Sequence, residues 1–303
     1  MSLSDEQISQ RYRYWRPRLM MSMIIAAFYL TRKSAIFAMP VMQFELGLTK
    51  DNIGLMWTLF YLTYGVSKFL CGMLNDSRNM RWFMGVGLLI TGVLNILFAF
   101  SYSLSSLLLI WTLNGFFQAW GWPPCAKVLT RWYTRRERGF WWGCWNMSIS
   151  LGGAAVPLIS GGLAINYGWQ AALFVPGILG VVLGIWLCRQ LQDSPQQQGL
   201  PSVGQWFNDP LELRQVQMSP PAPILQIFRK AILFNSTIWL LGISYVLVYL
   251  VRTALNDWGN IWLAESHGIG LLSANMTLSL FELGGLAVAL FAGWGSDLLF
   301  RVQ

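Results

Sequence analysis

The chain has 303 residues, of which 11% are charged and 55% are hydrophobic, and its mean hydropathy is +0.46. Soluble domains carry about 25% charged residues, so this composition excludes water as the solvent for most of the surface. The net charge of +8 comes from basic residues spread between apolar segments. This distribution argues against a nucleic-acid-binding patch and favours orientation charges on a membrane protein.

The first eighteen residues are polar and contain four arginines. The apolar run that follows is too long for the core of a signal peptide, so we expect it to stay in the protein as the first span. A spanning helix needs roughly 20 mostly apolar residues, and eight segments qualify. No ten-residue stretch alternates with period two, as a membrane β-strand would, so the predicted fold is an all-α membrane bundle. The expected spans are about 19–39, 54–74, 82–101, 104–126, 140–164, 169–188, 232–255 and 271–295.

Lysine and arginine are divided unequally between the two sides of these spans. Sixteen of the 21 basic residues lie on the side that holds both termini and the loops after the second, fourth and sixth spans. The other side has only Lys50. Because cytoplasmic loops carry an excess of lysine and arginine, we predict a bacterial inner-membrane protein whose N-terminus is cytoplasmic.

Segment 189–231 contains six prolines and a glutamine run, a composition typical of a linker. It divides the chain into a six-span N-terminal half (1–188), a cytoplasmic linker loop (189–231) and the first two spans of an incomplete second half (232–303).

Cysteine and histidine usage gives no support for a metal centre or for catalysis. The single histidine is His267, and the cysteines lie apart in apolar stretches without zinc-ligand spacing or a CxxC motif. The sequence also lacks a nucleophile–base pair and a phosphate-binding glycine loop. We therefore predict that the protein is not an enzyme and needs no cofactor. The cysteines, expected to be buried thiols, are Cys71, Cys125, Cys144 and Cys188.

Five charged residues lie inside the predicted spans. Each costs at least a few kcal/mol if it faces lipid, so each is expected to face a cavity or a partner. Lys68 is within two turns of the cytoplasmic end of its span, so its ammonium could instead reach the interface. The five residues are Arg32, Lys33, Lys68, Arg252 and Glu282.

Two short patterns repeat at almost the same distance along the chain. Phe28–Arg32 resembles Val248–Arg252 at a spacing of 220 residues. The pattern Gly72-x-x-x-Asp76 resembles Gly293-x-x-x-Asp297 at a spacing of 221 residues. This shared offset indicates a duplicated six-span unit whose halves are related by an axis along the membrane normal. An arginine follows each copy of the second pattern, and we assign these residues to a gating motif; the two arginines are Arg81 and Arg301.

The repeat places Arg32 and Arg252 at equivalent positions, where they could approach each other near the axis. Two arginines held together in a low-dielectric cavity repel, so they need an anion. Phosphate fits, because it has nearly two negative charges and oxygens that match planar guanidinium groups. The alternative is that each arginine pairs with a buried acid such as Asp257 or Glu282. We favour anion binding because neither acid is repeated.

Several stretches are together specific for one family: Phe28–Ser34, Tyr64–Phe69, Gly121–Cys125, Glu137–Gly139, Trp145–Asn146 and Asp257–Trp258. With them the chain resembles, over essentially all 303 residues, the organophosphate:phosphate antiporter family of the major facilitator superfamily. Further stretches resemble the members that sense external glucose 6-phosphate: Arg11–Arg16, Val246–Arg252, Asn256–Asn260, Phe281–Gly285 and Gly293–Asp297.

The resemblance implies that Arg32 and Arg252 hold the substrate phosphate. It also implies that further side chains line the cavity, namely Lys33, Tyr29, Tyr64, Lys68, Trp145 and Tyr249. The chain departs from the family in two respects. Ile149 stands where the family has a histidine that contributes to substrate binding. Family members have twelve spans, whereas we expect eight here.

We therefore expect a sensor of external hexose phosphate that signals to a membrane histidine kinase, with a phosphorylated sugar and inorganic phosphate as ligands. Two alternatives stay open, the first of them because the same two arginines would serve it. One is an organophosphate:phosphate exchanger that works by alternating access. The other is an inactive, truncated member that lacks four helices and does not exchange its ligands.

Overall fold

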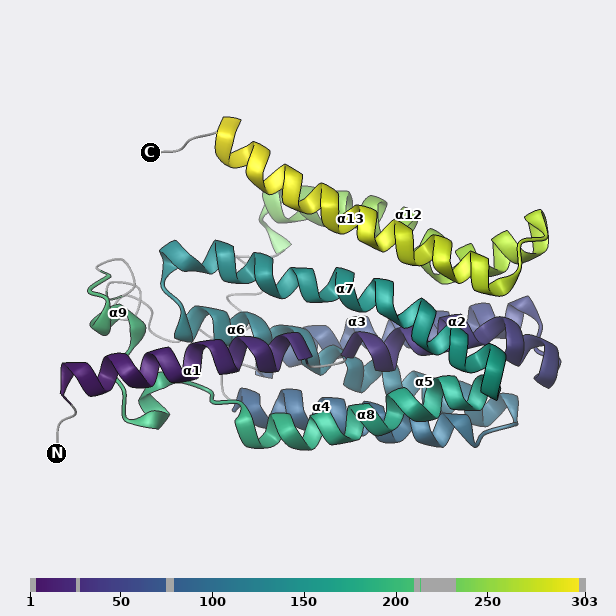
Figure 1. The fold of residues 1–303 in the computed structure, drawn as a ribbon, viewed down its shortest axis with the longest axis horizontal. Helices are drawn as coiled ribbons and strands as arrows, with labels where there is room; N and C mark the ends of the chain where they lie inside the picture. Colours follow the sequence, from purple (N-terminus) through teal and green to yellow (C-terminus); the bar gives the residue numbers. More distant parts are fainter. Residues whose placement is uncertain (1–3, 26–27, 75–78, 210–212, 214–232, 300–303) are drawn as a thin grey trace.

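The computed structural model describes residues 4–25, 28–74, 79–209, 213 and 233–299, with the backbone alone for 74 and 289–299. Its regular structure is helical throughout these ranges, which confirms the predicted all-α fold (Figure 1). The elements are α1 (Asp5–Ile25), α2 (Phe28–Leu46), α3 (Lys50–Leu74), α4 (Met80–Ala99), α5 (Leu104–Gln118), the 3₁₀ helix η1 (Ala119–Gly121), α6 (Trp122–Trp132), α7 (Arg135–Tyr167), α8 (Trp169–Gln190), the 3₁₀ helix η2 (Pro195–Gln198), α9 (Val203–Trp206), α12 (Ser236–His267) and α13 (Leu271–Leu299).

Six stretches of the described chain are long and apolar enough to cross a membrane, and they agree with six of the eight predicted spans. They are Asp5–Leu46, Met80–Ala99, Arg135–Tyr167, Trp169–Gln190, Ser236–His267 and Leu271–Val288. The other two predicted spans, 54–74 and 104–126, are also helical. The first lies in α3, which contains many polar side chains. The second is divided between α5, which has only 15 residues, and α6.

The division of the fourth predicted span has a local cause. Pro123 and Pro124 occupy the first positions of α6, where a missing backbone N–H costs little. Continuing α5 through them would lose backbone hydrogen bonds, so the chain makes the 3₁₀ turn η1 and restarts as α6 at Trp122. This break places Trp122 beside the cavity described below.

Small residues let α4 and α8 pack closely against each other. A Cβ atom on Gly92 would lie 2.6 Å from the backbone nitrogen of Val181. Glycine at this contact lets the two helix backbones touch, as is common between membrane helices. Polar groups between α2 and α4 add hydrogen bonds, since Asn95 donates to the Thr31 carbonyl oxygen at 2.9 Å.

α12 and α13 form an antiparallel pair that lies along α7 (Figure 1). α13 packs against α7. The C-terminal part of α12 contacts α2, where Asn260 Nδ2 donates to the Ile36 carbonyl oxygen at 3.1 Å. The first half of α12 is exposed, apolar side chains included.

The start of the predicted linker is packed against the first six helices. Tyr12 Oη donates to the Pro201 carbonyl oxygen at 2.7 Å, and Trp132 Nε1 donates to that of Gln192 at 3.1 Å. The side chains of Leu200 and Val203 are buried in one hydrophobic cluster with those of Tyr12 and Trp132. Residues 191–207, which follow α8, therefore pack against α1 and α6.

Candidate functional site

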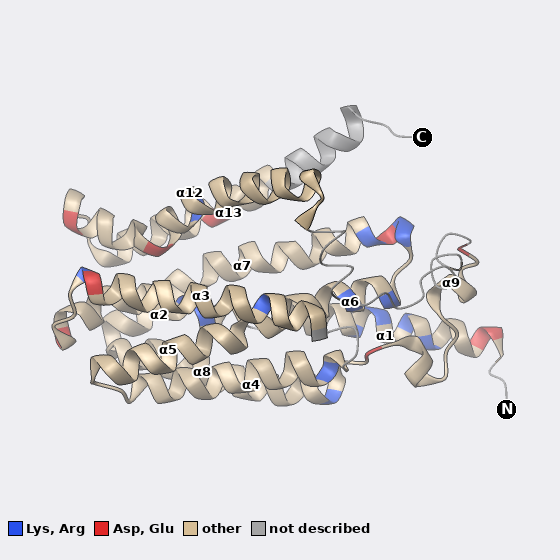
Figure 2. Ribbon diagram, turned by 180° about the vertical axis from the view of Figure 1, so that it is seen from behind, with Lys and Arg blue, Asp and Glu red and all other residues tan. Residues whose placement is uncertain are grey.

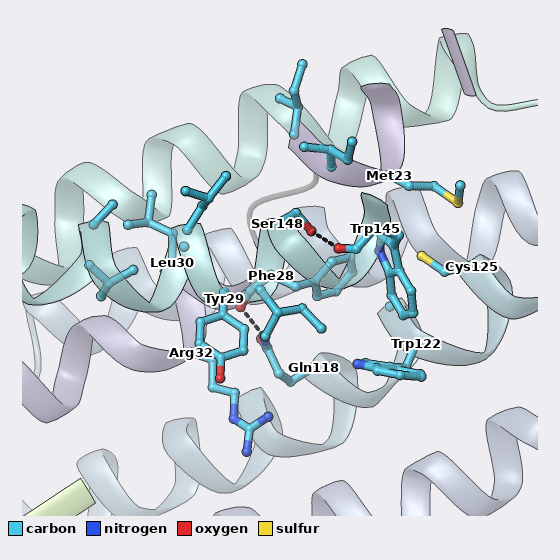
Figure 3. A pocket seen from close by; sticks show the side chains of 18 of the residues that line it. Met23, Phe28, Tyr29, Leu30, Arg32, Gln118, Trp122, Cys125, Trp145 and Ser148 are labelled. Atoms are coloured by element: carbon cyan, nitrogen blue, oxygen red, sulfur yellow. Dashed lines mark hydrogen bonds between the residues drawn. The ribbon is translucent and has the colours of Figure 1, made fainter. Parts of the chain in front are cut away.

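A cavity of about 350 Å³ lies inside the first half of the chain, within the usual size range of small-molecule sites. Its wall is formed by residues of α1, α2, α3, α4, α5, η1, α6 and α7. Figure 3 shows aromatic rings on two sides of it and the Arg32 side chain at one end. Four residues predicted from the sequence to line a cavity do so, namely Tyr29, Arg32, Tyr64 and Trp145.

Arg32 provides the positive charge of the cavity wall. Its guanidinium carbon lies 4.8 Å from the ring centroid of Tyr64 and 5.5 Å from that of Tyr61. Nε of Arg32 is buried and makes no hydrogen bond to any described residue. No described carboxylate forms an ion pair with it either. The site therefore presents a guanidinium held by aromatic rings with hydrogen-bonding capacity left over.

Lys33 points to a different neighbour. Its Nζ lies 2.9 Å from Asp257 Oδ1, and both side chains are almost fully buried. The Tyr61 hydroxyl donates to the other oxygen of the same carboxylate. Each charge thus has a partner, as a buried ion pair requires. This network joins α2 and α3 to α12.

Arg252 pairs with Glu282, at 3.3 Å between a guanidinium nitrogen and Oε2. For Arg252, therefore, the alternative of pairing with a buried acid holds in this structure. Its side chain is 40% exposed, and it does not line the cavity around Arg32. Tyr249 also lies outside that cavity, because it is exposed on α12 and stacks on Tyr245 at a centroid distance of 5.8 Å.

Lys68 lies beside the cavity, between two aromatic rings. Its Nζ is 5.3 Å from the centroid of the Trp122 ring and 5.5 Å from that of Tyr64. A cation near the face of an aromatic ring is attracted to it, so these two rings hold the ammonium close to the cavity.

The residues of the predicted gating motif are only partly described. Gly72 is exposed on α3. Arg81 donates through Nε to the Cys188 carbonyl oxygen and so joins the start of α4 to the end of α8. Asp76 and Arg301 lie outside the described residues, as do the side-chain surroundings of Gly293 and Asp297.

Three residues of the site were not selected from the sequence. Tyr61 precedes Tyr64 by one helical turn, and that spacing could have placed both rings on the face of Arg32. Trp122 could have been found from its position beside the proline pair. Gln118 gave no signal, although its amide donates to the Phe28 carbonyl oxygen where α2 begins (Figure 3). Ile149, at the position of the family histidine, does line the cavity.

The chain is similar to several known proteins. The model of the Major Facilitator Superfamily matches residues 21–302. The membrane sensor protein UhpC of Escherichia coli is 49% identical over 297 residues, which are 97% of this chain and 68% of that protein. A probable hexose phosphate transport protein of Chlamydia trachomatis is 41% identical over 312 residues, covering 99% of this chain and 68% of the relative. The glycerol-3-phosphate transporter of Bacillus subtilis is 30% identical over 306 residues, which are 99% of this chain and 69% of that transporter.

Among solved structures, an inward-facing, unoccupied bacterial homologue of the human lysosomal transporter Spinster matches with a TM-score of 0.67. Its sequence is 19% identical, so this likeness concerns the fold alone. The match covers 93% of this chain but 61% of the solved one. The chain thus spans about two thirds of its curated relatives and about three fifths of that structure.

Proposed function

This chain belongs to the major facilitator superfamily, and we propose that it binds a phosphorylated sugar in the cavity around Arg32. The observation that carries the proposal is a guanidinium in a cavity wall without a carboxylate partner among the described residues. A phosphate group suits this position, because its oxygens accept two parallel hydrogen bonds from an arginine.

Two further cations are available for the same ligand. Among the described residues, Lys68 is held by the faces of Tyr64 and Trp122 and not by a carboxylate, so a phosphate near Arg32 would attract it at little cost. Arg252 is 40% exposed and pairs with the buried Glu282, and we propose that it exchanges this partner for the phosphate when the two halves approach. Lys33 is not a third cation for the ligand, because its charge is neutralised by Asp257.

We propose further that the protein is a sensor of external hexose phosphate, in particular glucose 6-phosphate, and that it passes the bound state to a membrane histidine kinase. The support is the likeness to UhpC, which is described as a membrane sensor protein. The second candidate is exchange of an organophosphate for inorganic phosphate. It is supported by the relatives described as hexose phosphate and glycerol-3-phosphate transporters.

The proposed binding site is tested with arginine-to-lysine variants. Arg32→Lys and Arg252→Lys keep a positive charge but lose the planar group that holds phosphate with two hydrogen bonds. We expect both to lose most of the affinity for labelled glucose 6-phosphate in equilibrium binding to purified protein. Arg18→Lys is the matched control, because Arg18 contacts the ring of Tyr14 away from the cavity. Unchanged binding in both site variants would contradict the assignment.

A second experiment separates the sensor from the exchanger. Uptake of labelled glucose 6-phosphate is measured beside induction of a reporter for hexose phosphate uptake in the same cells. A sensor induces the reporter without taking up the label, and Arg32→Lys abolishes induction. Uptake without induction would favour the exchanger.

A further inference from the structure

Trp122 and Trp145 form an aromatic corner at the end of the cavity away from Arg32. Their ring centroids are 4.4 Å apart, and the ring planes meet at 67° (Figure 3). Trp142 supports the corner from behind, with its ring centroid 5.9 Å from that of Trp122, but it does not line the cavity. The corner therefore offers two rigid ring surfaces to a ligand that enters beside Arg32.

The polar side chains nearby are already engaged within the protein. The Gln118 amide donates to the Phe28 carbonyl oxygen, and Ser148 Oγ donates to the Trp145 carbonyl oxygen at 2.5 Å (Figure 3). In contrast, the indole N–H groups of Trp122 and Trp145 make no hydrogen bond to any described residue. Neither group is fully buried, so both are accessible. A ligand at this end thus meets ring faces and two free N–H donors.

A cation lies near the face of Trp122. The Nζ atom of Lys68 lies 5.3 Å from that ring centroid, and no described carboxylate forms an ion pair with it. An ammonium gains less from an exposed aromatic face than from a phosphate, which accepts a charge-assisted hydrogen bond from it. A phosphate bound at Arg32 would therefore draw Lys68 away and free the ring.

We propose that Trp122 is a specificity-determining residue whose ring face is taken either by Lys68 or by the sugar ring of a ligand, the sugar replacing Lys68 once phosphate has drawn the ammonium away. This inference rests on the proposed function, because it needs a phosphorylated sugar in this cavity. A hexose has a face broad enough to cover an indole, whereas glycerol and phosphate have none. Trp122 would thus add affinity for a hexose phosphate and cost affinity for phosphate alone.

The test is equilibrium binding of glucose 6-phosphate, glycerol 3-phosphate and inorganic phosphate to the purified 303-residue chain. Trp122→Leu keeps an apolar side chain but removes the ring face and the N–H donor. We expect glucose 6-phosphate to bind about tenfold more weakly, as the loss of one aromatic contact predicts. Inorganic phosphate should bind at least as well as to the wild type, and up to about fivefold more tightly, because Lys68 no longer has to leave the ring.

Trp142→Leu is the matched control, since it removes an indole from the same cluster outside the cavity wall; the ratio of the three affinities should not change. Trp122→Phe, which restores a ring face, should recover part of the glucose 6-phosphate affinity. Equal loss for all three ligands in Trp122→Leu would overturn the inference, as would unchanged glucose 6-phosphate binding. If the wild type binds none of the ligands, the proposed function itself fails.

Discussion

Arg32 and Lys33 are neighbours in sequence, yet they serve different parts of the molecule. Successive residues of an α-helix point about 100° apart, so the two cations of α2 leave the helix in different directions. Arg32 reaches the rings of α3 beside the cavity, and Lys33 reaches Asp257 of α12. One cation is thus left for a ligand while the other joins two parts of the bundle.

The Lys33–Asp257 pair gives a prediction for stability. Lys33→Met leaves a buried carboxylate whose one remaining side-chain hydrogen bond among the described residues comes from Tyr61, and breaking such a pair costs about 3–5 kcal/mol. We expect a clearly lower melting temperature, measured by loss of the helical circular-dichroism signal in detergent. Lys33→Met combined with Asp257→Leu removes both charges and should recover most of the loss.

The control for this pair is Lys50→Met. Lys50 pairs with Glu265, but both side chains are about half exposed, and such pairs contribute little. Its melting temperature should stay close to that of the wild type. A double Lys33–Asp257 variant as unstable as the single one would show that the pair is not the cause.

The sequence singled out the charged residues inside the helices, but it did not indicate which side chains pair with one another. Charges inside apolar segments are costly, and this identified Arg32, Lys33, Arg252 and Glu282. Asp257 was considered as a partner for an arginine, but it pairs with Lys33. Pairing depends on the rotation of each helix and on which helices are neighbours, and a single sequence contains neither directly.

At the scale of elements, helices were predicted well and their ends less well. The seventh predicted span ends at residue 255, whereas α12 continues to His267. The added turns contain Asn256, Asp257 and Asn260, which lower the local hydropathy. These polar side chains are nonetheless buried, because α2 provides partners for them, such as Lys33 for Asp257. Hydropathy cannot foresee that a polar residue will be satisfied by another helix.

The contact between α4 and α8 gives a prediction at this scale. A Cβ atom on Gly184 would lie 2.6 Å from the backbone nitrogen of Leu89 and 2.9 Å from the carbonyl oxygen of Gly85. Backbone atoms cannot move aside as a side chain can, so Gly184→Ala must separate the two helices. We expect a loss of about 1–3 kcal/mol, the usual range for overpacking, seen as a lower melting temperature.

Gly162→Ala is the matched control for this contact. Gly162 lies inside α7, and apart from the adjoining backbone of that helix no atom of the described residues lies within 4 Å of the position of its added Cβ. Alanine favours a helix interior over glycine by roughly 0.5–1 kcal/mol, so this variant should be as stable as the wild type or slightly more stable. If Gly184→Ala behaved in the same way, close contact between α4 and α8 would not be needed.

At the scale of the whole molecule, basic residues gather at one end. Figure 2 shows lysine and arginine near the start of α7, in α6 and α1 and at the start of α4. The opposite end holds Lys50, at the start of α3. The unequal count along the sequence thus corresponds to two different ends in space. The packed segment 191–207 lies at the basic end, which the linker-like composition did not reveal.

This charge distribution predicts the orientation of the protein in the membrane, with the basic end in the cytoplasm. Single cysteines test it in a background without Cys71, Cys125, Cys144 and Cys188. Thr49→Cys and Ser266→Cys lie at the end with few basic residues, and Arg136→Cys and Gln197→Cys at the basic end. All four positions are exposed, and Gly47 and Gly268 are avoided because their backbone φ angles of +63° and +64° suit only glycine.

An impermeant thiol reagent added to intact cells should label Thr49→Cys and Ser266→Cys and leave Arg136→Cys and Gln197→Cys unlabelled. After the membrane is permeabilised, all four should react, which controls for exposure and expression. The expectation follows from the cost of translocation, because the basic end would have to bring many arginines across the bilayer to reach the periplasm. The reverse pattern would mean that the excess of lysine and arginine does not set the orientation of this chain.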